Sequence, residues 1–205
     1  MSNTSDAYYT IKRSSQGFYK EKGSKFIALA YHVRTEEEIK EIQHNLRKEY
    51  HDARHHCYAY VIGFNGEAWR ANDDGEPSST AGKPIHGQIL SRNLTNTLVV
   101  VIRYFGGTKL GVSGLINAYK TAASEALDSA EIVMRTVNDI YRLSFDYDDT
   151  NDVMRLIKDD GINILEQNFG AACDMLLAIR QGLVEQVLDK VEKIDSAEAE
   201  YLMTE

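Results

Sequence analysis

The chain of 205 residues is 43% hydrophobic and 26% charged, with a formal net charge of −8 at pH 7. This composition is that of a globular protein with a packed core, and the length allows one large domain or two of moderate size. No apolar run reaches the roughly 18 residues of a membrane-spanning helix, and residues 1–10 lack the basic and apolar parts of a signal peptide. We therefore expect a cytoplasmic protein without a membrane partner.

The negative charge lies almost entirely in the last third of the chain. Residues 1–134 hold 16 Lys and Arg against 15 Asp and Glu, a net charge of +1, whereas residues 135–205 hold 7 against 16, a net charge of −9. A near-neutral first part can still present a local basic face. The acidic total therefore does not exclude a nucleic-acid partner.

Hydrophobic patterning in the first part indicates strands mixed with helices. Thr35 and Glu38 stand at capping-box spacing before an apolar helical face, and the run from Gly63 to Gly66 separates two segments typical of a β-hairpin. The unbroken apolar run that ends at Arg103 is typical of a buried central strand. The predicted strands are residues 8–13, 25–33, 56–63, 67–72 and 97–105, and the predicted helices are residues 35–50, a helix from Pro84, and residues 111–130.

A domain boundary is predicted near residue 134, where a helical pattern ends and a strand pattern begins. Beyond it, strands are predicted at residues 137–147, 162–169, 173–180 and 197–203, and helices at residues 150–160 and 183–194. This βαββαβ order is typical of a ferredoxin-like fold. We therefore expect an α+β protein with two domains, residues 1–134 and 135–205. Cys57 and Cys173 lie in apolar strand-like runs and are expected to be buried free thiols.

The stretch RYFGGTKLG follows the central strand and suggests a turn that binds anions. Gly106 and Gly107 allow a left-handed backbone or the close approach of a ligand. The helix start that follows, which includes Ser113, presents unpaired N–H groups beside Lys109, and such a turn binds phosphate readily. The same residues equally suit a tight strand-to-helix turn with Arg103 in a structural ion pair. The P-loop and dinucleotide-binding patterns are absent from the sequence.

Two further segments carry groups that suit chemistry. In DARHHC, Arg54 offers a phosphate contact, while His55 and His56 point to opposite faces of a strand, so only one of them can face a site. In DDGEPSSTAGK, the carboxylates of residues 73, 74 and 76 suit a divalent metal or acid and base catalysis. The same residues also strongly favour a turn without any ligand. No pattern of a serine nucleophile surrounds its hydroxyls.

Four motifs, in this order and spacing, closely resemble the IMPACT family, whose bacterial members are called YigZ proteins. They are KGSKFIA, ARHHCYAY, DDGEPSSTAGKPI and VVVIRYFGGTKLGVSGLINAY. The resemblance covers most of residues 8–130 and has one departure at His86, where a second aliphatic residue is usual. The C-terminal part resembles the small ferredoxin-like domain of the bacterial members by pattern more than by motif.

The resemblance implies a first domain of the ribosomal-protein/elongation-factor type, with a mixed sheet backed by helices. It implies a second domain similar to the last domain of translocation elongation factors. Eukaryotic relatives are regulators of translation that carry a further N-terminal RWD domain, which is not expected here. For bacterial members the implied role is association with RNA, the ribosome or nucleotides.

Two functional hypotheses follow, besides a plain protein-interaction adaptor. The first is a non-enzymatic module that binds RNA, the ribosome or a translation factor, without a cofactor or catalytic residue, and in which Tyr104 or Phe105 stacks on a base. Its predicted ligand residues are Arg54, His56, Arg103, Tyr104, Gly106, Gly107, Lys109 and Ser113. The second is a metal-assisted hydrolase that uses Asp73, Asp74 and Glu76 together with His55 or His56. If the acidic loop lies beside the glycine turn, the basic residues are neutralised or the site is metal-assisted. If the loop lies far away, the turn is an open anion site.

Overall fold

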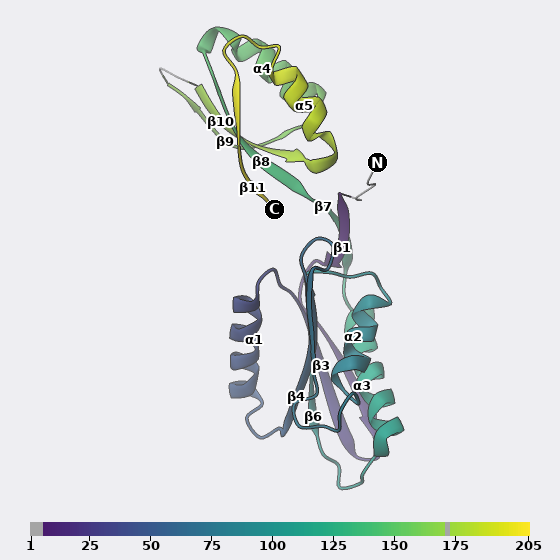
Figure 1. The fold of residues 1–205 in the computed structure, drawn as a ribbon. Helices are drawn as coiled ribbons and strands as arrows, with labels where there is room; N and C mark the ends of the chain where they lie inside the picture. Colours follow the sequence, from purple (N-terminus) through teal and green to yellow (C-terminus); the bar gives the residue numbers. More distant parts are fainter. Residues whose placement is uncertain (1–5, 171–172) are drawn as a thin grey trace. The chain divides into compact units, whose positions relative to one another are not determined.

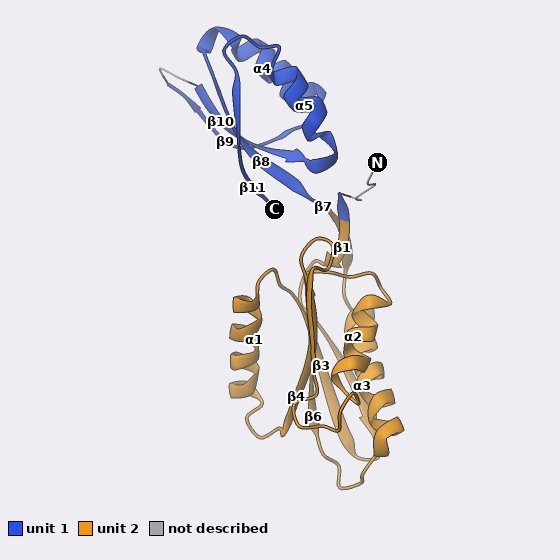
Figure 2. Ribbon diagram, viewed as in Figure 1, with its two compact units in different colours: residues 1–7, 136–205 blue, residues 8–135 orange. Residues whose placement is uncertain are grey.

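The protein divides into two compact units, which a computed structural model describes over residues 6–170 and 173–205. The N-terminal unit spans residues 8–135, and the C-terminal unit consists of residues 136–205 with Asp6 and Ala7 (Figure 2). Among the described residues, no helix is both long enough and apolar enough to cross a membrane.

Asp6 and Ala7 were expected in the first domain but belong to the C-terminal unit. The Asp6 carboxylate accepts two hydrogen bonds from the Arg180 guanidinium, at 2.7 and 2.8 Å, and a third from the Gly182 amide at 3.0 Å. Its carbonyl oxygen accepts a hydrogen bond from the Val137 amide at 2.8 Å. These contacts attach the start of the chain to residues more than 130 positions away, which a sequence pattern does not reveal.

The elements up to residue 136 form one five-stranded sheet, a two-stranded sheet and three helices (Figure 1). They are β1 (Ala7–Ile11), β2 (Ser15–Glu21), β3 (Ser24–His32), α1 (Glu36–Glu49), β4 (His55–Ile62), β5 (Ala68–Asn72), α2 (Gly82–Leu90), β6 (Thr97–Tyr104), α3 (Gly111–Asp128) and β7 (Ile132–Thr136). The large sheet has the order β2-β3-β6-β4-β5, and β1 pairs with β7.

All four pairings of the large sheet are antiparallel, so the expected mixed sheet is wrong for this unit. The strands β3 and β4 are connected through α1 and do run the same way. They are not neighbours, however, because β6 inserts between them and pairs antiparallel with both. The late strand β6 thereby becomes the centre of the sheet, as its unbroken apolar run predicts.

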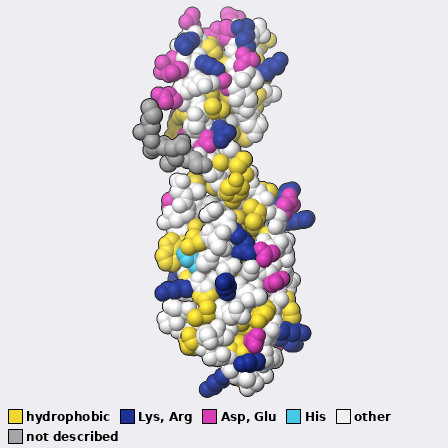
Figure 3. Space-filling model, turned by 90° about the vertical axis from the view of Figure 1, so that its right-hand side faces the viewer, with side chains coloured by type: hydrophobic (Ala, Val, Ile, Leu, Met, Phe, Trp, Pro, Cys, Tyr) yellow, Lys and Arg dark blue, Asp and Glu magenta, His cyan; other side chains and the backbone are white. Residues whose placement is uncertain are grey.

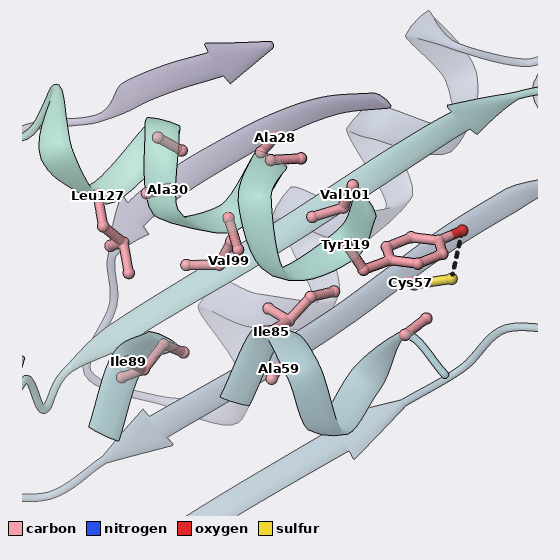
Figure 4. Packing of buried hydrophobic residues seen from close by; sticks show 14 of the residues in the cluster. Ala28, Ala30, Cys57, Ala59, Ile85, Ile89, Val99, Val101, Tyr119 and Leu127 are labelled. Carbon is pink, nitrogen blue, oxygen red and sulfur yellow. Dashed lines mark hydrogen bonds between the residues drawn. The ribbon is translucent and has the colours of Figure 1, made fainter. Parts of the chain in front are cut away.

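The large sheet is covered by helices on both faces, with α1 on one side and α2 and α3 on the other (Figure 1). Alternation along β6 sends Val99 and Val101 into the cluster with α2 and α3, and Val100 into the cluster with α1. Figure 4 shows the first of these clusters, in which aliphatic side chains of the sheet meet both helices. Because β6 is buried on both faces, the core fixes the point at which the glycine turn begins.

The start of α1 agrees with its sequence signal. The Thr35 hydroxyl accepts a hydrogen bond from the Glu38 amide at 3.2 Å, and the Glu38 carboxylate accepts one from the Arg34 amide at 2.7 Å. Ile39 and Leu46 are buried against the sheet. The side-chain cap replaces hydrogen bonds that the first turn of a helix lacks.

The sequence analysis missed β2, because its fully buried position is a glycine and no alternation of apolar side chains marks the strand. Gly17, in the middle of β2, lies against the main chain of Glu125 and Ala126 in α3, where a Cβ atom would collide with both. The strand therefore buries backbone rather than an apolar side chain at this point. The hairpin to β3 turns at Lys22 and Gly23, with φ angles of 46° and 81°.

The C-terminal unit contains a four-stranded antiparallel sheet with the order β11-β8-β10-β9. Two α-helices and two short 3-10 segments accompany it in the described residues. Its elements are β8 (Asn138–Phe145), η1 (Tyr147–Asp149), α4 (Thr150–Asp159), β9 (Asn163–Phe169), β10 (Cys173–Arg180), η2 (Gln181–Leu183), α5 (Val184–Val191) and β11 (Glu198–Thr204). One core forms between α4, α5 and a single face of this sheet.

Two glycine substitutions test this packing in opposite directions. Gly17→Ala should lower the free energy of unfolding by about 3 kcal/mol, because the new methyl group must separate β2 from α3. Gly87→Ala in α2 should raise it by about 0.5–1 kcal/mol, because nothing lies within 4 Å of the added atom and alanine favours a helix. Urea unfolding of both variants measures the difference. Equal effects would contradict the close approach of β2 and α3.

Candidate functional site

The end of β6 directs consecutive side chains to opposite faces of the sheet. Arg103 points to the face with α2 and α3, whereas the Tyr104 hydroxyl donates a hydrogen bond to the Asp52 carboxylate at 2.7 Å on the other face. That hydrogen bond raises the pKa of Tyr104 to about 12. Phe105 is 56% exposed, and its ring centre lies 5.7 Å from the guanidinium carbon of Arg103. Of the two aromatic residues that follow Arg103 in sequence, Phe105 therefore lies beside its guanidinium, and Tyr104 lies on the other face of the sheet.

Arg103 is part of a buried ion pair. Its Nη1 atom donates to the Glu76 Oε1 atom at 2.6 Å, and the two side chains are only 8% and 4% exposed. The same carboxylate oxygen accepts a hydrogen bond from the Tyr119 hydroxyl at 2.8 Å. The Phe26 ring lies 5.6 Å from the guanidinium carbon. The acidic loop and the glycine turn thus meet at Arg103, whose charge is compensated within the protein.

The ion pair continues into a buried chain of hydrogen bonds below the acidic loop. The Cys57 thiol lies 3.3 Å from the Tyr119 hydroxyl (Figure 4). It also lies 3.0 Å from the Asp73 carbonyl oxygen. Burial raises the pKa of both Cys57 and Tyr119 above their ordinary values. Neither group therefore ionises at neutral pH, and both serve to hold the loop on α3 and β4.

Asp73 organises the loop and the start of α2. Its carboxylate accepts hydrogen bonds from the amides of Ser79 at 2.8 Å, Ala81 at 3.0 Å and Gly82 at 2.8 Å. Burial alone would raise the pKa of Asp73, but these three donors outweigh it and hold the pKa below its ordinary value. The charged carboxylate replaces the missing hydrogen bonds of the first helical turn.

Asp74 joins the loop to the start of β4 and to α1. Its carboxylate accepts hydrogen bonds from Arg47 at 2.8 Å and from the His56 amide at 2.6 Å. Burial opposes the charged form, but the donors Arg47 and His56 outweigh it and lower the pKa of Asp74. The backbone of Asp74 is left-handed, with a φ of 42°, and its carbonyl oxygen lies 2.9 Å from Nδ1 of His55.

The two histidines occupy opposite faces of β4, as the alternation of a strand requires. His55 lies against the loop, whereas the buried His56 ring faces the side of α1, where neither ring nitrogen has a hydrogen-bond partner in the described residues. Burial, followed by the nearby Arg47 charge, lowers the pKa of His56. His56 is therefore a neutral core side chain, separated by the sheet from Arg103.

The hypothesis of a shared metal site in the acidic loop is not supported by this geometry. The carboxylates of Asp73, Asp74 and Glu76 bind backbone amides, Arg47 and Arg103 respectively. No group of three or more His, Cys, Asp or Glu side chains suited to a metal occurs over residues 6–170 and 173–205. Each of the three carboxylates is therefore bound by a different set of donors.

The glycine turn itself is exposed. Gly106 lies against Gly23 and Ser24 of the β2–β3 hairpin, where a Cβ atom would collide, and its amide donates to the Ser24 hydroxyl at 3.1 Å. Gly107 and Gly111 are left-handed, with φ angles of 88° and 71°, and nothing lies within 4 Å of an added Cβ atom. Gly107 and Gly111 are thus required for a left-handed backbone, and Gly106 is required because the β2–β3 hairpin packs closely against it.

The first turn of α3 lacks a side-chain cap. Its N-cap residue, Leu110, has no side chain that could accept a hydrogen bond, and no acidic residue occurs in the first turn. Lys109 and Ser113 are exposed on either side of this helix start. Arg54, also exposed, lies before β4. The amides at the start of α3 are therefore available to an anion beside a lysine.

Tyr119 and Cys57 were missed as members of this site. Tyr119 occupies the helical face that also carries Leu115, Ala118 and Ala122, and it is the one aromatic residue among these small side chains. A large polar-tipped residue on a small-residue face is a usable signal, because a buried tyrosine hydroxyl needs a partner. Its partner, Glu76, is 43 residues away in sequence and cannot be identified from spacing.

Together these features define an α+β protein with an exposed glycine turn anchored by a buried polar network. The family model of the Impact N-terminal domain matches residues 22–127, which is more than half of the chain. The chain belongs to the IMPACT family.

Individual relatives extend the similarity into the C-terminal unit. The IMPACT family member YigZ of Escherichia coli is 30% identical over 186 residues, which cover 90% of this chain and 91% of that protein. The family member YvyE of Bacillus subtilis is 43% identical over 141 residues, covering 69% of this chain and 65% of its own. A hypothetical protein of known crystal structure is 27% identical, with a TM-score of 0.71 over 97% of this chain and 98% of its own.

A mutant cycle tests the buried ion pair. Arg103→Met should lower the free energy of unfolding by about 3–5 kcal/mol, because it leaves a buried carboxylate without a cation. Adding Glu76→Gln should recover roughly half of this loss, because the amide removes the unpaired charge and still accepts from Tyr119. The matched control Arg54→Met, at an exposed arginine, should change the stability by less than about 0.5 kcal/mol. Losses that simply add in the double variant would contradict the pairing.

Asp73 should make stability depend on pH in acid. Because its pKa is lowered in the folded state, its contribution is complete above the ordinary aspartate pKa of 3.8 and is lost as the pH falls through the folded pKa. Asp73→Asn should therefore cost about 1 kcal/mol at neutral pH, and the difference from the natural protein should shrink below about pH 4. Urea unfolding at several pH values measures it. A constant difference down to strongly acidic pH would contradict this role.

Proposed function

We propose that this protein is a non-catalytic, translation-associated regulator that binds RNA phosphates at the exposed glycine turn. The observation that carries the proposal is the uncapped start of an 18-residue helix beside an exposed lysine, with an exposed aromatic ring directly after the strand that leads to it. Membership of the IMPACT family supports the translation-associated part, since the sequence resembles eukaryotic relatives that regulate translation. RNA, the ribosome or a translation factor is then the class of partner.

The parts of the site have different tasks in this proposal. The amides from Gly111 to Ser113 and the Lys109 ammonium bind phosphate, because a helix start favours negative charge and lysine adds a mobile cation. Phe105 stacks on a base or ribose. Arg103 does not bind the ligand directly, since Glu76 occupies it, but its guanidinium supports the Phe105 ring. Arg54 would extend the contacts along the RNA backbone.

The two folds also fit this assignment. We infer that the C-terminal unit is ferredoxin-like, and its βαββαβ order with the strand sequence β11-β8-β10-β9 supports this classification. The N-terminal unit is proposed to be of the ribosomal-protein/elongation-factor type. The resemblance described above implies that both folds are those of proteins of the translation apparatus. A cytoplasmic location is proposed because such a role requires it.

A charge reversal at the turn tests the proposal. In the full-length chain, Lys109→Glu should weaken the binding of a fluorescent single-stranded RNA by about tenfold at low salt and reduce the salt slope of log K by about one. Phe105→Ala should weaken single-stranded RNA but hardly affect inorganic phosphate, because only a base can stack on the ring. Fluorescence anisotropy across a range of salt concentrations measures both effects.

The control is Lys120→Glu, which makes the same charge change at an exposed position further along α3. It should weaken binding by less than about twofold, because a charge there acts only through screened long-range attraction. The proposal would be overturned by equal losses in the two lysine variants, or by natural protein that shows no saturable RNA binding at low salt.

A further inference from the structure

The sheet of the C-terminal unit has one face that carries no helix. Leu143 of β8 and Met175 and Leu177 of β10 point into the core with α4 and α5. The residues between them point to the other side, because successive side chains in a strand alternate. In the described part of this unit both helices lie on the core side of the sheet (Figure 1), so no helix covers the second face. Ile140 and Ala178 are buried at one end of that face, and the exposed part lies at its other end.

Strand register places two rows of side chains across this open face. One row contains Glu166, Leu176, Arg142 and Glu200, from β9 to β11, and the next contains Asn168, Asp174, Ser144 and Glu198. We use the term acidic face for these eight residues. They include four carboxylates against one guanidinium, which is a marked excess of negative charge for adjacent positions of one sheet.

Most of this negative charge has no compensating cation. Arg142 pairs with Glu200 at 3.3 Å, but both side chains are more than half exposed, so the pair is weak and screened by salt. Asp174 accepts a hydrogen bond from the neutral Ser144 hydroxyl at 2.6 Å. In the range of residues that the structure covers, Glu166, Asp174 and Glu198 make no ion pair. The acidic face is thus able to accept cations from outside the chain.

The acidic face is also hollowed and partly apolar. A cavity of about 260 Å³ is lined by Arg142, Glu166, Asp174 and Leu176, and by Leu202 of β11. Leu202 is 36% exposed, and the neighbouring Met203 is 53% exposed. An aliphatic side chain, or the aliphatic stem of a lysine or arginine, fits between these leucines while its charged end reaches a carboxylate.

We propose that the acidic face docks an extended, cationic segment of a protein partner. Lysine or arginine side chains of that segment pair with Glu166, Asp174 and Glu198, and its aliphatic groups fill the hollow between Leu176 and Leu202. Complementary charge governs which partner is accepted and how fast it arrives, since residues 135–205 carry a net charge of −9. Nucleic acid is disfavoured here because its phosphates would face uncompensated carboxylates. The surface is distinct from the glycine turn, so either proposal can fail without the other.

A cationic peptide probes the acidic face directly. A short synthetic peptide with lysine at alternate positions and alanine or leucine between them should bind the full-length chain at low salt and release as salt rises. The double substitution Glu166→Gln with Glu198→Gln should weaken this binding by about tenfold, because two exposed ion pairs are lost. Both residues are exposed, so the amides leave the fold intact, as circular dichroism would verify.

The matched control removes the same charge from the helical side of the unit. Glu185 and Asp189 are exposed on α5, a side where acidic and basic side chains are interspersed (Figure 3). Glu185→Gln with Asp189→Asn should weaken peptide binding by less than about twofold. Equal weakening in the two double variants would overturn the proposal, because it would indicate attraction to the unit's total charge. So would the absence of saturable peptide binding, or a loss of RNA binding on changing Glu166 and Glu198.

Discussion

The buried pair of Arg103 and Glu76 is the interaction on which the N-terminal unit depends. A guanidinium at the end of the central strand, shielded by Phe26 and nearly free of solvent, is tolerated only with a carboxylate beside it. The loop that carries Glu76 must therefore close over β6 and α3. Once it is closed, Asp73 caps α2 and Asp74 joins β4 to α1, so one ionic contact coordinates several elements.

The buried ion pair assigns most of the candidate polar residues of the N-terminal unit to structure. The charges of the acidic loop and of Arg103 are used internally, and what remains exposed is the glycine turn with Lys109 and the Phe105 ring. The C-terminal unit presents the opposite polarity, with an open face that is rich in carboxylates. In the two proposals made above, the N-terminal unit contacts RNA and the C-terminal unit contacts a basic protein segment.

Sequence patterns predicted the elements that depend on local chemistry. The cap at Thr35 located α1, and an unbroken apolar run located β6 at the centre of the sheet. The patterns failed where a distant contact decides the structure. The strand β2 has no apolar pattern at Gly17, because this glycine packs against the backbone of α3. The partner of Arg103 could not be predicted, because Glu76 lies 27 residues away in sequence. Alternation along β6 separates Tyr104 from Arg103, so of the two aromatic residues that the sequence offered only Phe105, directly after the strand, lies beside the guanidinium.

We propose that phosphate contacts the exposed turn and not the buried ion pair. Titration of isotopically labelled full-length protein with a short single-stranded RNA, followed by amide NMR shifts, tests it most directly. The largest shifts are expected at the amides of Gly107, Gly111 and Ser113, three exposed residues of the turn and of the start of α3. Little change is expected at Asp73 or Glu76, whose loop is fixed from within. Shifts concentrated in that loop, with the glycine turn unaffected, would contradict the account.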